Sequence, residues 1–245
     1  NINDGWAIEV VAFVPEPLVL ESVTATPACA ENVLRGSENN VMMGVKYNVT
    51  GEKGNIEISK LLFNAVDSNR QGIGAAKLWY TGTDASFNTV DLYAESTADV
   101  LSFDGNVRIK QPGEYYFWLT YDIKPDAAAG SSFESRFTST DVNGETIAST
   151  SRVIAATTLG TGRSGNITVG ASEEADYATI QEALNSLKTG IDGPVVIEVE
   201  DGEYNELVNI EQYKGASSIN TLTLRSKSGS PDKVCLLYTS PSPRD

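Results

Sequence analysis

Residues 18–156 consist of short segments rich in β-branched and aromatic residues, with turn residues between them. Ile56, Ile58 and Leu62 alternate with polar residues, as they do in a strand that has one face in water. Roughly eight such strands with frequent turn signals predict a sandwich of two antiparallel sheets. The expected strands cover residues 18–26, 41–50, 56–66, 76–80, 100–109, 115–121, 133–140 and 146–155.

Some of these segments carry a more specific expectation. Residues 115–121 (Tyr-Tyr-Phe-Trp-Leu-Thr-Tyr) are apolar on both faces, which predicts a central strand that is covered on both sides. Residues 100–109 contain Asp104-Gly105, a dipeptide suited to a tight hairpin because both residues tolerate positive φ. We therefore expect this segment to fold back at that point. A further turn is expected at residues 141–144, Asp-Val-Asn-Gly.

The pattern changes after residue 155. Residues 156–165 are rich in Thr, Ser and Gly, which predicts a linker. Thr179 and Glu182 then have the spacing of a capping box, in which each side chain bonds the backbone of the other residue. Gly190 supplies a left-handed stop, so a helix is expected between Thr179 and Gly190. Its apolar stripe is Ile180, Ala183, Leu184 and Leu187.

Short β-branched segments follow this helix. They lie at residues 195–199, 207–210 and 222–225, with turn residues such as Asp201-Gly202 between them. An amphipathic helix followed by stacked short strands is typical of a capped solenoid, because the first coil has no neighbour below it.

Charge and length limit the partners of the chain. The 245 residues include 18 Lys and Arg against 33 Asp and Glu, which gives a net charge of −15. Such a field repels nucleic acid, so we expect no nucleic-acid partner. No stretch approaches the roughly 20 apolar residues of a membrane span, so none is expected. The oligomeric state does not follow from the sequence.

The absence of His from the sequence excludes the commonest general base and metal ligand. Ser-His-Asp, Cys-His and His-zinc chemistry are therefore excluded within these residues. Cys29 is expected to be a small buried residue. We expect no catalytic residue, no metal ligand and no bound cofactor in this chain.

Both ends of the chain differ from the segments beside them. Residues 235–245 (Cys-Leu-Leu-Tyr-Thr-Ser-Pro-Ser-Pro-Arg-Asp) back-translate into a sequence similar to a transposase adapter used in sequencing libraries. We expect a non-native, irregular tail there; a native Pro/Ser-rich linker is the alternative. Residues 1–17 begin within a strand-like pattern and without Met, so they are expected to be the tail of a preceding segment. The chain is then a fragment of a longer, secreted bacterial protein.

Residues 18–155 resemble the BNR-repeat-associated N-terminal module of secreted bacterial sialidases and related surface proteins. The resemblance rests on Arg35-Gly36-Ser37, on residues 78–83 (Leu-Trp-Tyr-Thr-Gly-Thr) and on residues 116–123 (Tyr-Phe-Trp-Leu-Thr-Tyr-Asp-Ile). It implies an immunoglobulin-like sandwich that serves as an accessory module without catalytic residues. It does not imply sialidase activity.

Residues 166–234 resemble the start of pectin-lyase-like β-helices, among them pectinesterases. The matching stretches are residues 176–183 (Asp-Tyr-Ala-Thr-Ile-Gln-Glu-Ala) and 196–206, in which Asp201-Gly202 replaces the Pro-Gly usual in that family. The resemblance implies the capping helix and first coils of a right-handed parallel β-helix. The catalytic carboxylates and Arg of the family lie on later coils, so no residue of this chain takes their roles.

Two groups of side chains have both a functional and a structural interpretation. Trp79, Tyr80, Tyr116 and Trp118 either form a sugar-stacking platform or pack in the core, and we favour the core. Glu198, Glu200, Asp201, Glu203 and Glu206 either bind Ca²⁺ or act as an acid–base pair, or lie on a solvated strand face and a turn. We favour the solvated face.

The sequence leaves more than one class of function open. The first is an extracellular polysaccharide-active protein, a carbohydrate esterase or polysaccharide lyase, with the sandwich as an accessory or spacer module and polysaccharide or cell-surface glycan as the expected partner. The second is an adhesin or structural surface protein whose β-helix is a stalk. A sialidase-associated protein is a third and weaker possibility.

Overall fold

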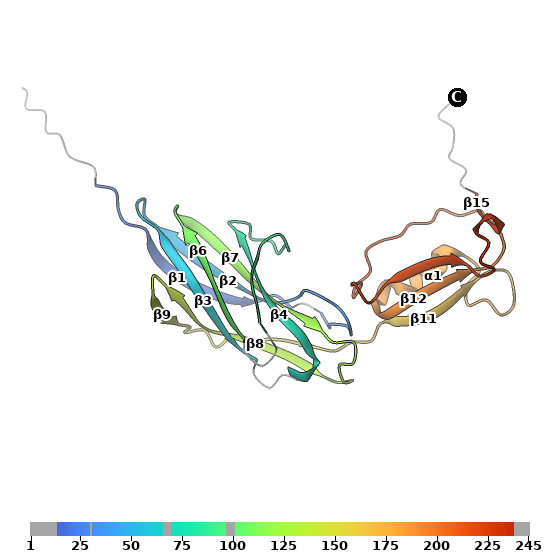
Figure 1. The fold of residues 1–245 in the computed structure, drawn as a ribbon, viewed down its shortest axis with the longest axis horizontal. Helices are drawn as coiled ribbons and strands as arrows, with labels where there is room; N and C mark the ends of the chain where they lie inside the picture. The colour runs from blue at the N-terminus through green and yellow to red at the C-terminus, as the bar shows by residue number, and fades with distance from the viewer. Residues whose placement is uncertain (1–13, 30, 66–69, 97–100, 238–245) are drawn as a thin grey trace, which may run out of the picture.

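The computed structural model describes residues 14–29, 31–65, 70–96 and 101–237. It is mainly β, and two bodies lie side by side along its long axis (Figure 1). The N-terminal body contains two antiparallel sheets, and the C-terminal body contains parallel strand pairs and one short α-helix. None of the helices that the described residues form is long and apolar enough to cross a bilayer.

The first antiparallel sheet has the strand order β1-β2-β7-β4-β5. The segment expected at residues 115–121 lies within β7, the middle strand, as predicted. Its side chains alternate, so that Phe117 and Leu119 point into the core and are fully buried. The expected cover on both faces is wrong, because Tyr116 and Trp118 on the outer face are only half-buried. The strands of this sheet are Val19–Pro27 (β1), Asn40–Thr50 (β2), Gly113–Ile123 (β7), Ile73–Gly82 (β4) and Leu92–Ser96 (β5).

The second antiparallel sheet has the order β10-β8-β3-β6, with β9 also paired to β8. Its inward residues join those of the first sheet in one apolar core, in which Phe63, Phe103 and Phe137 meet edge to face. The strands are Ala155–Thr158 (β10), Ser132–Val142 (β8), Ile56–Asn64 (β3), Ser102–Ile109 (β6) and Glu145–Ala148 (β9); a 3-10 turn, Arg70–Gly72, precedes β4.

The two turns expected from Gly dipeptides have opposite outcomes. Asn143 and Gly144 adopt φ of 52° and 82° between β8 and β9, so the predicted turn at residues 141–144 is confirmed. The predicted hairpin at Asp104-Gly105 is wrong, because β6 runs through both residues as one strand. Gly105 instead makes room for a ring: a Cβ there would lie 2.6 Å from Cζ of Tyr93.

The C-terminal body is built from parallel strands. β11 (Arg163–Val169), β12 (Ile191–Val199) and β14 (Leu222–Ser226) form one three-stranded sheet, and β13 (Gly202–Tyr204) pairs in parallel with β15 (Val234–Leu236). Ile167, Ile197 and Leu224 lie in one row across the larger sheet. A 3-10 turn, Pro231–Lys233, leads into β15.

The helix expected after Thr179 is confirmed. Helix α1 (Ile180–Asn185) continues as a 3-10 turn, Ser186–Thr189, and ends at Gly190, whose φ is 101°. Thr179 Oγ1 accepts from the Glu182 amide at 3.2 Å, and the Glu182 carboxylate accepts from the Thr179 amide at 3.2 Å. The predicted apolar stripe is buried: Ile180, Ala183, Leu184 and Leu187 are all at most 1 % exposed.

Four expectations on strand positions differ from the structure. The strand expected at residues 146–155 is divided, because β9 ends at Ala148 and β10 begins at Ala155. Residues 207–210 form no strand, and Leu207 and Ile210 are exposed. Cys235 and Leu236 belong to β15 rather than to an irregular tail, because the edge of β13 offers their backbone a parallel partner. The range expected as a linker, residues 156–165, is strand at both ends, where β10 extends to Thr158 and β11 begins at Arg163.

A segment between β1 and β2 connects the two bodies. Leu34 is 2 % exposed, and its side chain lies over two glycines of the C-terminal body: a Cβ on Gly190 or Gly215 would lie 2.5 or 2.8 Å from its Cδ1. Both glycines have positive φ and leave the space that Leu34 fills. On the sandwich side, the Gly160 amide donates to the Val33 carbonyl at 2.8 Å.

Polar contacts reinforce this junction. The buried Asn220 side chain donates from Nδ2 to the carbonyl oxygens of Arg35 at 2.6 Å and Gly215 at 2.9 Å. Lys214 and Glu31 form an ion pair at 2.6 Å on the surface nearby. The two bodies are therefore held together by a buried leucine, a buried amide and a surface ion pair.

Candidate functional site

A groove of about 370 Å³ lies on the outer face of the first sheet. Its volume falls within the roughly 300–1,000 Å³ typical of small-ligand sites. Three neighbouring strands and one loop supply the lining: Thr24 and Thr26 from β1, Gly44 and Lys46 from β2, Tyr116 and Trp118 from β7, and Ala85 from the β4–β5 loop.

Strand register arranges this lining in two rows across the sheet. In one row Trp118 lies opposite Gly44, which lies opposite Thr26. In the other row Tyr116 lies opposite Lys46, which lies opposite Thr24. Because neighbouring residues of a strand point to opposite faces, the same β7 that buries Phe117 turns Tyr116 and Trp118 outward.

The glycine in the first row lets the indole lie close to the sheet. A Cβ at Gly44 would come within 2.9 Å of Cζ3 of Trp118, so the ring occupies the space above the Gly44 backbone. Cε3 and Cη2 of the same ring lie 3.2 and 3.4 Å from that Cβ position, so the six-membered ring of Trp118 covers the Gly44 backbone while the side chain borders the groove. Trp118 is half-buried, as expected for that position.

Trp79 on β4 and Trp118 on β7 each donate a hydrogen bond to a threonine hydroxyl on the other strand. Trp118 Nε1 donates to Thr81 Oγ1 at 3.1 Å, and Trp79 Nε1 donates to Thr120 Oγ1 at 3.0 Å. Phe87, from the β4–β5 loop, packs edge-on against both indoles, with ring centroids 6.3 Å from Trp118 and 6.4 Å from Trp79. The Trp118 indole is thus fixed in position, and its N–H is already bonded.

Polar groups stand at one end of the groove. Lys46 Nζ lies 2.6 Å from Oε1 of Glu114, and the Tyr116 hydroxyl donates to the other Glu114 oxygen at 2.7 Å. The hydrogen bond from Lys46, with the one from Tyr116, lowers the pKa of Glu114. The same bond to Glu114 raises the pKa of Lys46. Both groups therefore carry their charges at neutral pH.

The four aromatic residues expected in the core divide between two environments. Tyr80 packs against the sandwich core, whereas Trp79 lies opposite Trp118 on the outer face of the sheet and is 8 % exposed. The core interpretation is wrong for Trp118 and Tyr116, which line the groove, because even-numbered positions of β7 face outward. Sequence analysis missed Thr24, Thr26, Gly44, Lys46 and Ala85, whose proximity depends on strand register and on a loop.

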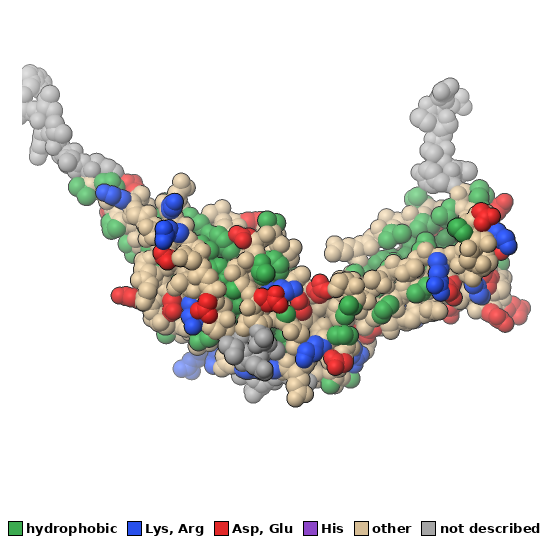
Figure 2. Space-filling model, viewed as in Figure 1, with side chains coloured by type: hydrophobic (Ala, Val, Ile, Leu, Met, Phe, Trp, Pro, Cys, Tyr) green, Lys and Arg blue, Asp and Glu red, His purple; other side chains and the backbone are tan. Residues whose placement is uncertain are grey.

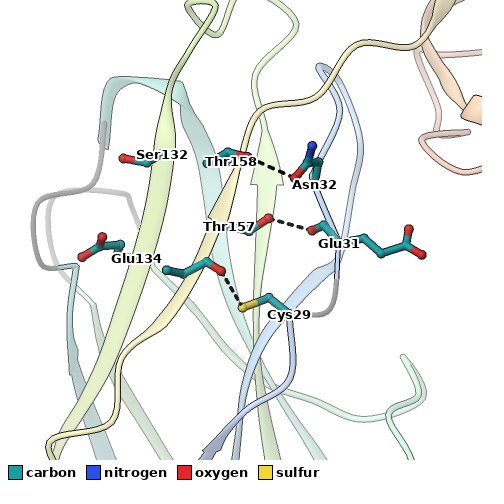
Figure 3. Close-up of a pocket in the computed structure, with 8 residues that line it drawn as sticks. Cys29, Glu31, Asn32, Ser132, Glu134, Thr157 and Thr158 are labelled. Atoms are coloured by element: carbon teal, nitrogen blue, oxygen red, sulfur yellow. Dashed lines mark hydrogen bonds between the residues drawn. The ribbon is translucent and has the colours of Figure 1, made fainter.

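A second pocket, of about 300 Å³, lies beside β10 and is lined by Cys29, Glu31, Asn32, Ser132, Glu134, Ala156, Thr157 and Thr158 (Figure 3). Three of its side chains form hydrogen bonds within the protein: Thr157 Oγ1 donates to the Glu31 carbonyl at 2.7 Å, Cys29 Sγ donates to the Ala156 carbonyl at 3.2 Å, and Thr158 Oγ1 donates to Asn32 Oδ1 at 3.0 Å. Burial raises the pKa of the Cys29 thiol, so it stays protonated and is a poor nucleophile. Cys29 is half-buried, as a small packing residue.

The acidic residues of the C-terminal body do not converge on one point. Glu198 pairs with Arg225 across β12 and β14, and Glu200 pairs with Lys227 at 3.1 Å just beyond the ends of these strands. Among the described residues, no group of three or more His, Cys, Asp or Glu side chains is arranged to hold a metal.

Glu206 has a separate role from the rest of the acidic cluster. Its carboxylate accepts from the amides of Ile180 and Gln181, both at 2.8 Å, at the start of α1. This satisfies amides that a helix leaves unpaired at its first turn. Glu206 therefore joins the irregular segment after β13 to the helix.

Comparisons with known proteins give remote similarities. No protein-family model and no curated protein matches the chain. Among solved structures, the Hadza microbial sialidase Hz136 is similar at 17% identity and TM-score 0.39, over 56% of this chain and 31% of that chain, so the chain spans about a third of that sialidase. The CssB subunit of enterotoxigenic Escherichia coli colonization factor CS6, complemented with a donor strand from CssA, is 14% identical with TM-score 0.29, over 56% of this chain and 97% of that one. The CupB6 tip adhesin of Pseudomonas aeruginosa is 10% identical with TM-score 0.20, over 63% and 62% of the two chains.

Proposed function

We propose that this chain is a carbohydrate-binding accessory module and that the groove on its first sheet is the binding site. The observation that carries the proposal is the position of Trp118: its indole lies over Gly44, is fixed by Thr81, and borders a groove with hydroxyl groups. Aromatic faces bind the apolar C–H faces of sugar rings, and neighbouring hydroxyls bind the sugar hydroxyls. This arrangement can hold a saccharide, and we assign it no catalytic role.

The hydroxyls of Thr24 and Thr26 stand across the groove from the two aromatic residues. They are exposed on β1, where each can donate or accept a hydrogen bond. A sugar stacked on Trp118 would present its edge to them. The binding residues in this proposal are Thr24, Thr26, Lys46, Tyr116 and Trp118.

The surrounding organisation is part of the same proposal. Residues 18–155 would be an immunoglobulin-like sandwich and residues 166–234 the capping helix and first coils of a right-handed parallel β-helix. The parent would be a secreted protein at the bacterial cell surface or outside the cell, with the module directing a polysaccharide-active enzyme to its substrate. An adhesin that holds a host glycan would use the same groove.

Binding of the full chain to a panel of soluble polysaccharides, followed by affinity electrophoresis and tryptophan fluorescence, tests the proposal. Trp118→Ala should weaken binding about tenfold or more, because it removes the stacking face. Gly44→Val should weaken it as well by displacing the indole. Val90→Ala is the matched control, since Val90 is 89% exposed on the β4–β5 loop and does not line the groove.

The result has a clear alternative. If Trp118→Ala binds every saccharide that the unmodified chain binds with unchanged affinity, the groove is not the site. If the unmodified chain binds no saccharide of the panel, the proposed function is wrong.

A further inference from the structure

The charge on the groove is already neutralised. Lys46 is the charged residue among the described side chains that line it, and its Nζ lies 2.6 Å from Glu114 Oε1. The Tyr116 hydroxyl donates to the second oxygen of the same carboxylate. The Lys46 ammonium group therefore has a carboxylate beside it, and the pair adds no net positive charge to the groove.

This pair persists over a wide pH range. The Glu114 pKa is lowered by its hydrogen bonds from Lys46 and Tyr116, so the carboxylate stays ionised below the usual titration range of Glu. The Lys46 pKa is raised by the bond to Glu114, so the ammonium group stays charged at alkaline pH. Neither partner becomes free near neutral pH.

A carboxylated sugar would need a charge-assisted donor that this groove does not offer. Proteins bind carboxylates through Arg forks or unpaired ammonium groups. No Arg is among the residues that line the groove, and its Lys46 is engaged. An anionic ligand would also approach a chain of net charge −15 and the Glu114 carboxylate.

We infer that the groove takes a neutral saccharide and discriminates against uronate and sialate residues. The inference rests on the proposed function, since it specifies the ligand class of the same groove. A neutral sugar carries no charge for the Lys46–Glu114 pair to repel, so it can lie in the groove without separating the pair.

Two matched pairs of probes test this directly. Methyl-esterified and de-esterified oligogalacturonides differ in the carboxylate alone, and sialyllactose adds one carboxylated sugar residue to lactose. Isothermal titration of the full chain at low and at high salt should give tighter binding of the neutral member. Its affinity should not depend on salt, whereas any weak binding of the anionic member should change with ionic strength.

Glu114→Gln tests whether the Lys46–Glu114 pair is the reason why the groove favours a neutral sugar. The substitution leaves the Lys46 charge without its partner, so affinity for the anionic member should rise several-fold, while affinity for the neutral member stays within about twofold. Trp118→Ala should weaken binding of both members about tenfold or more. Asp104→Asn is the matched charge control, because it removes a carboxylate that pairs with Lys60 across β6 and β3 of the other sheet.

The outcomes separate this inference from the proposed function. Tighter binding of the anionic member by the unmodified chain, lost in Trp118→Ala, would overturn the inference and leave the groove as a saccharide site. Binding of neither member would overturn both. If Glu114→Gln fails to fold, the comparison of the matched probes on the unmodified chain still decides the matter.

Discussion

The sandwich and the C-terminal body bury their apolar residues to different extents. In the sandwich, the interior lies between two sheets, and Phe103, Phe117 and Phe133 are fully buried. In the C-terminal body, β12 has a partner strand on each side, and Ile197 is likewise fully buried. One layer further, Leu224 on β14 is 39% exposed.

Ile197 and Leu224 show why the two regions differ in burial, because these residues lie opposite each other in register on adjacent strands. Both are large aliphatic residues at inward positions, yet one is covered and the other is not. The difference comes from the layers on either side, since β14 has a neighbour on one side among the described strands. Figure 2 shows the consequence as apolar side chains along the upper surface of the C-terminal body. In a stacked parallel fold, each layer is stabilised by the next.

Two side-chain truncations, one in each region, test whether the two regions differ in burial in this way. Phe117→Ala should destabilise the sandwich by about 3–5 kcal/mol, because it leaves a cavity among Tyr47, Tyr80 and Tyr93. Leu224→Ala should cost less than about 1 kcal/mol, because the side chain is already partly in water. Urea unfolding followed by tryptophan fluorescence and circular dichroism measures both. Equal losses would contradict the view that the outer layer is weakly buried.

Local signals in the sequence predict local structure well in both regions. The capping box at Thr179 and Glu182 needs residues three apart, and the structure forms both of its hydrogen bonds. The turn at Asn143-Gly144 follows from backbone conformations that Asn and Gly adopt readily. Asp104-Gly105 is the same kind of dipeptide but forms no turn. Gly105 instead leaves room for the Tyr93 ring, which lies on another strand.

The groove could not be predicted because it depends on long-range register. Trp118 lies in a strand that is apolar at successive positions, so alternation alone does not say which face is the core. Its neighbour Gly44 is more than seventy residues away in the sequence, and the loop residue Phe87 comes from a third segment. The absence of a strand at residues 207–210 has a similar cause: β-branched residues form a strand when a partner edge is available.

A substitution at the junction tests how far the stability of the C-terminal body depends on its contact with the sandwich. Asn220→Ala removes an amide that bonds the Arg35 and Gly215 carbonyls, which should cost about 1–3 kcal/mol because the site is buried. We expect the loss in the C-terminal body, so amide exchange should quicken in β12 and stay unchanged in β7. Asn209→Ala is the matched control, since Asn209 is exposed. Unchanged exchange in β12 would mean that the C-terminal body is stable without this contact.

The loss of stability at alkaline pH should also differ between the two regions, by a smaller amount. Burial raises the pKa of Tyr121 in the sandwich core from its ordinary value of 10 to about 12. Its neutral form is therefore favoured in the folded state, so the stabilisation is complete below pH 10 and is lost as the pH rises from 10 toward 12. Tyr121→Phe cannot titrate, so between pH 10 and 11 it should lose about 1 kcal/mol less than the unmodified chain. The slopes of stability against pH are compared, because the variant also lacks the bond from the Tyr121 hydroxyl to the Glu134 carbonyl. Tyr213→Phe is the matched change in the C-terminal body, where Tyr213 is half-buried, and it should alter the slope less. If Tyr121→Phe and the unmodified chain lose stability in parallel, burial of this hydroxyl does not separate the closed core from the partly covered one.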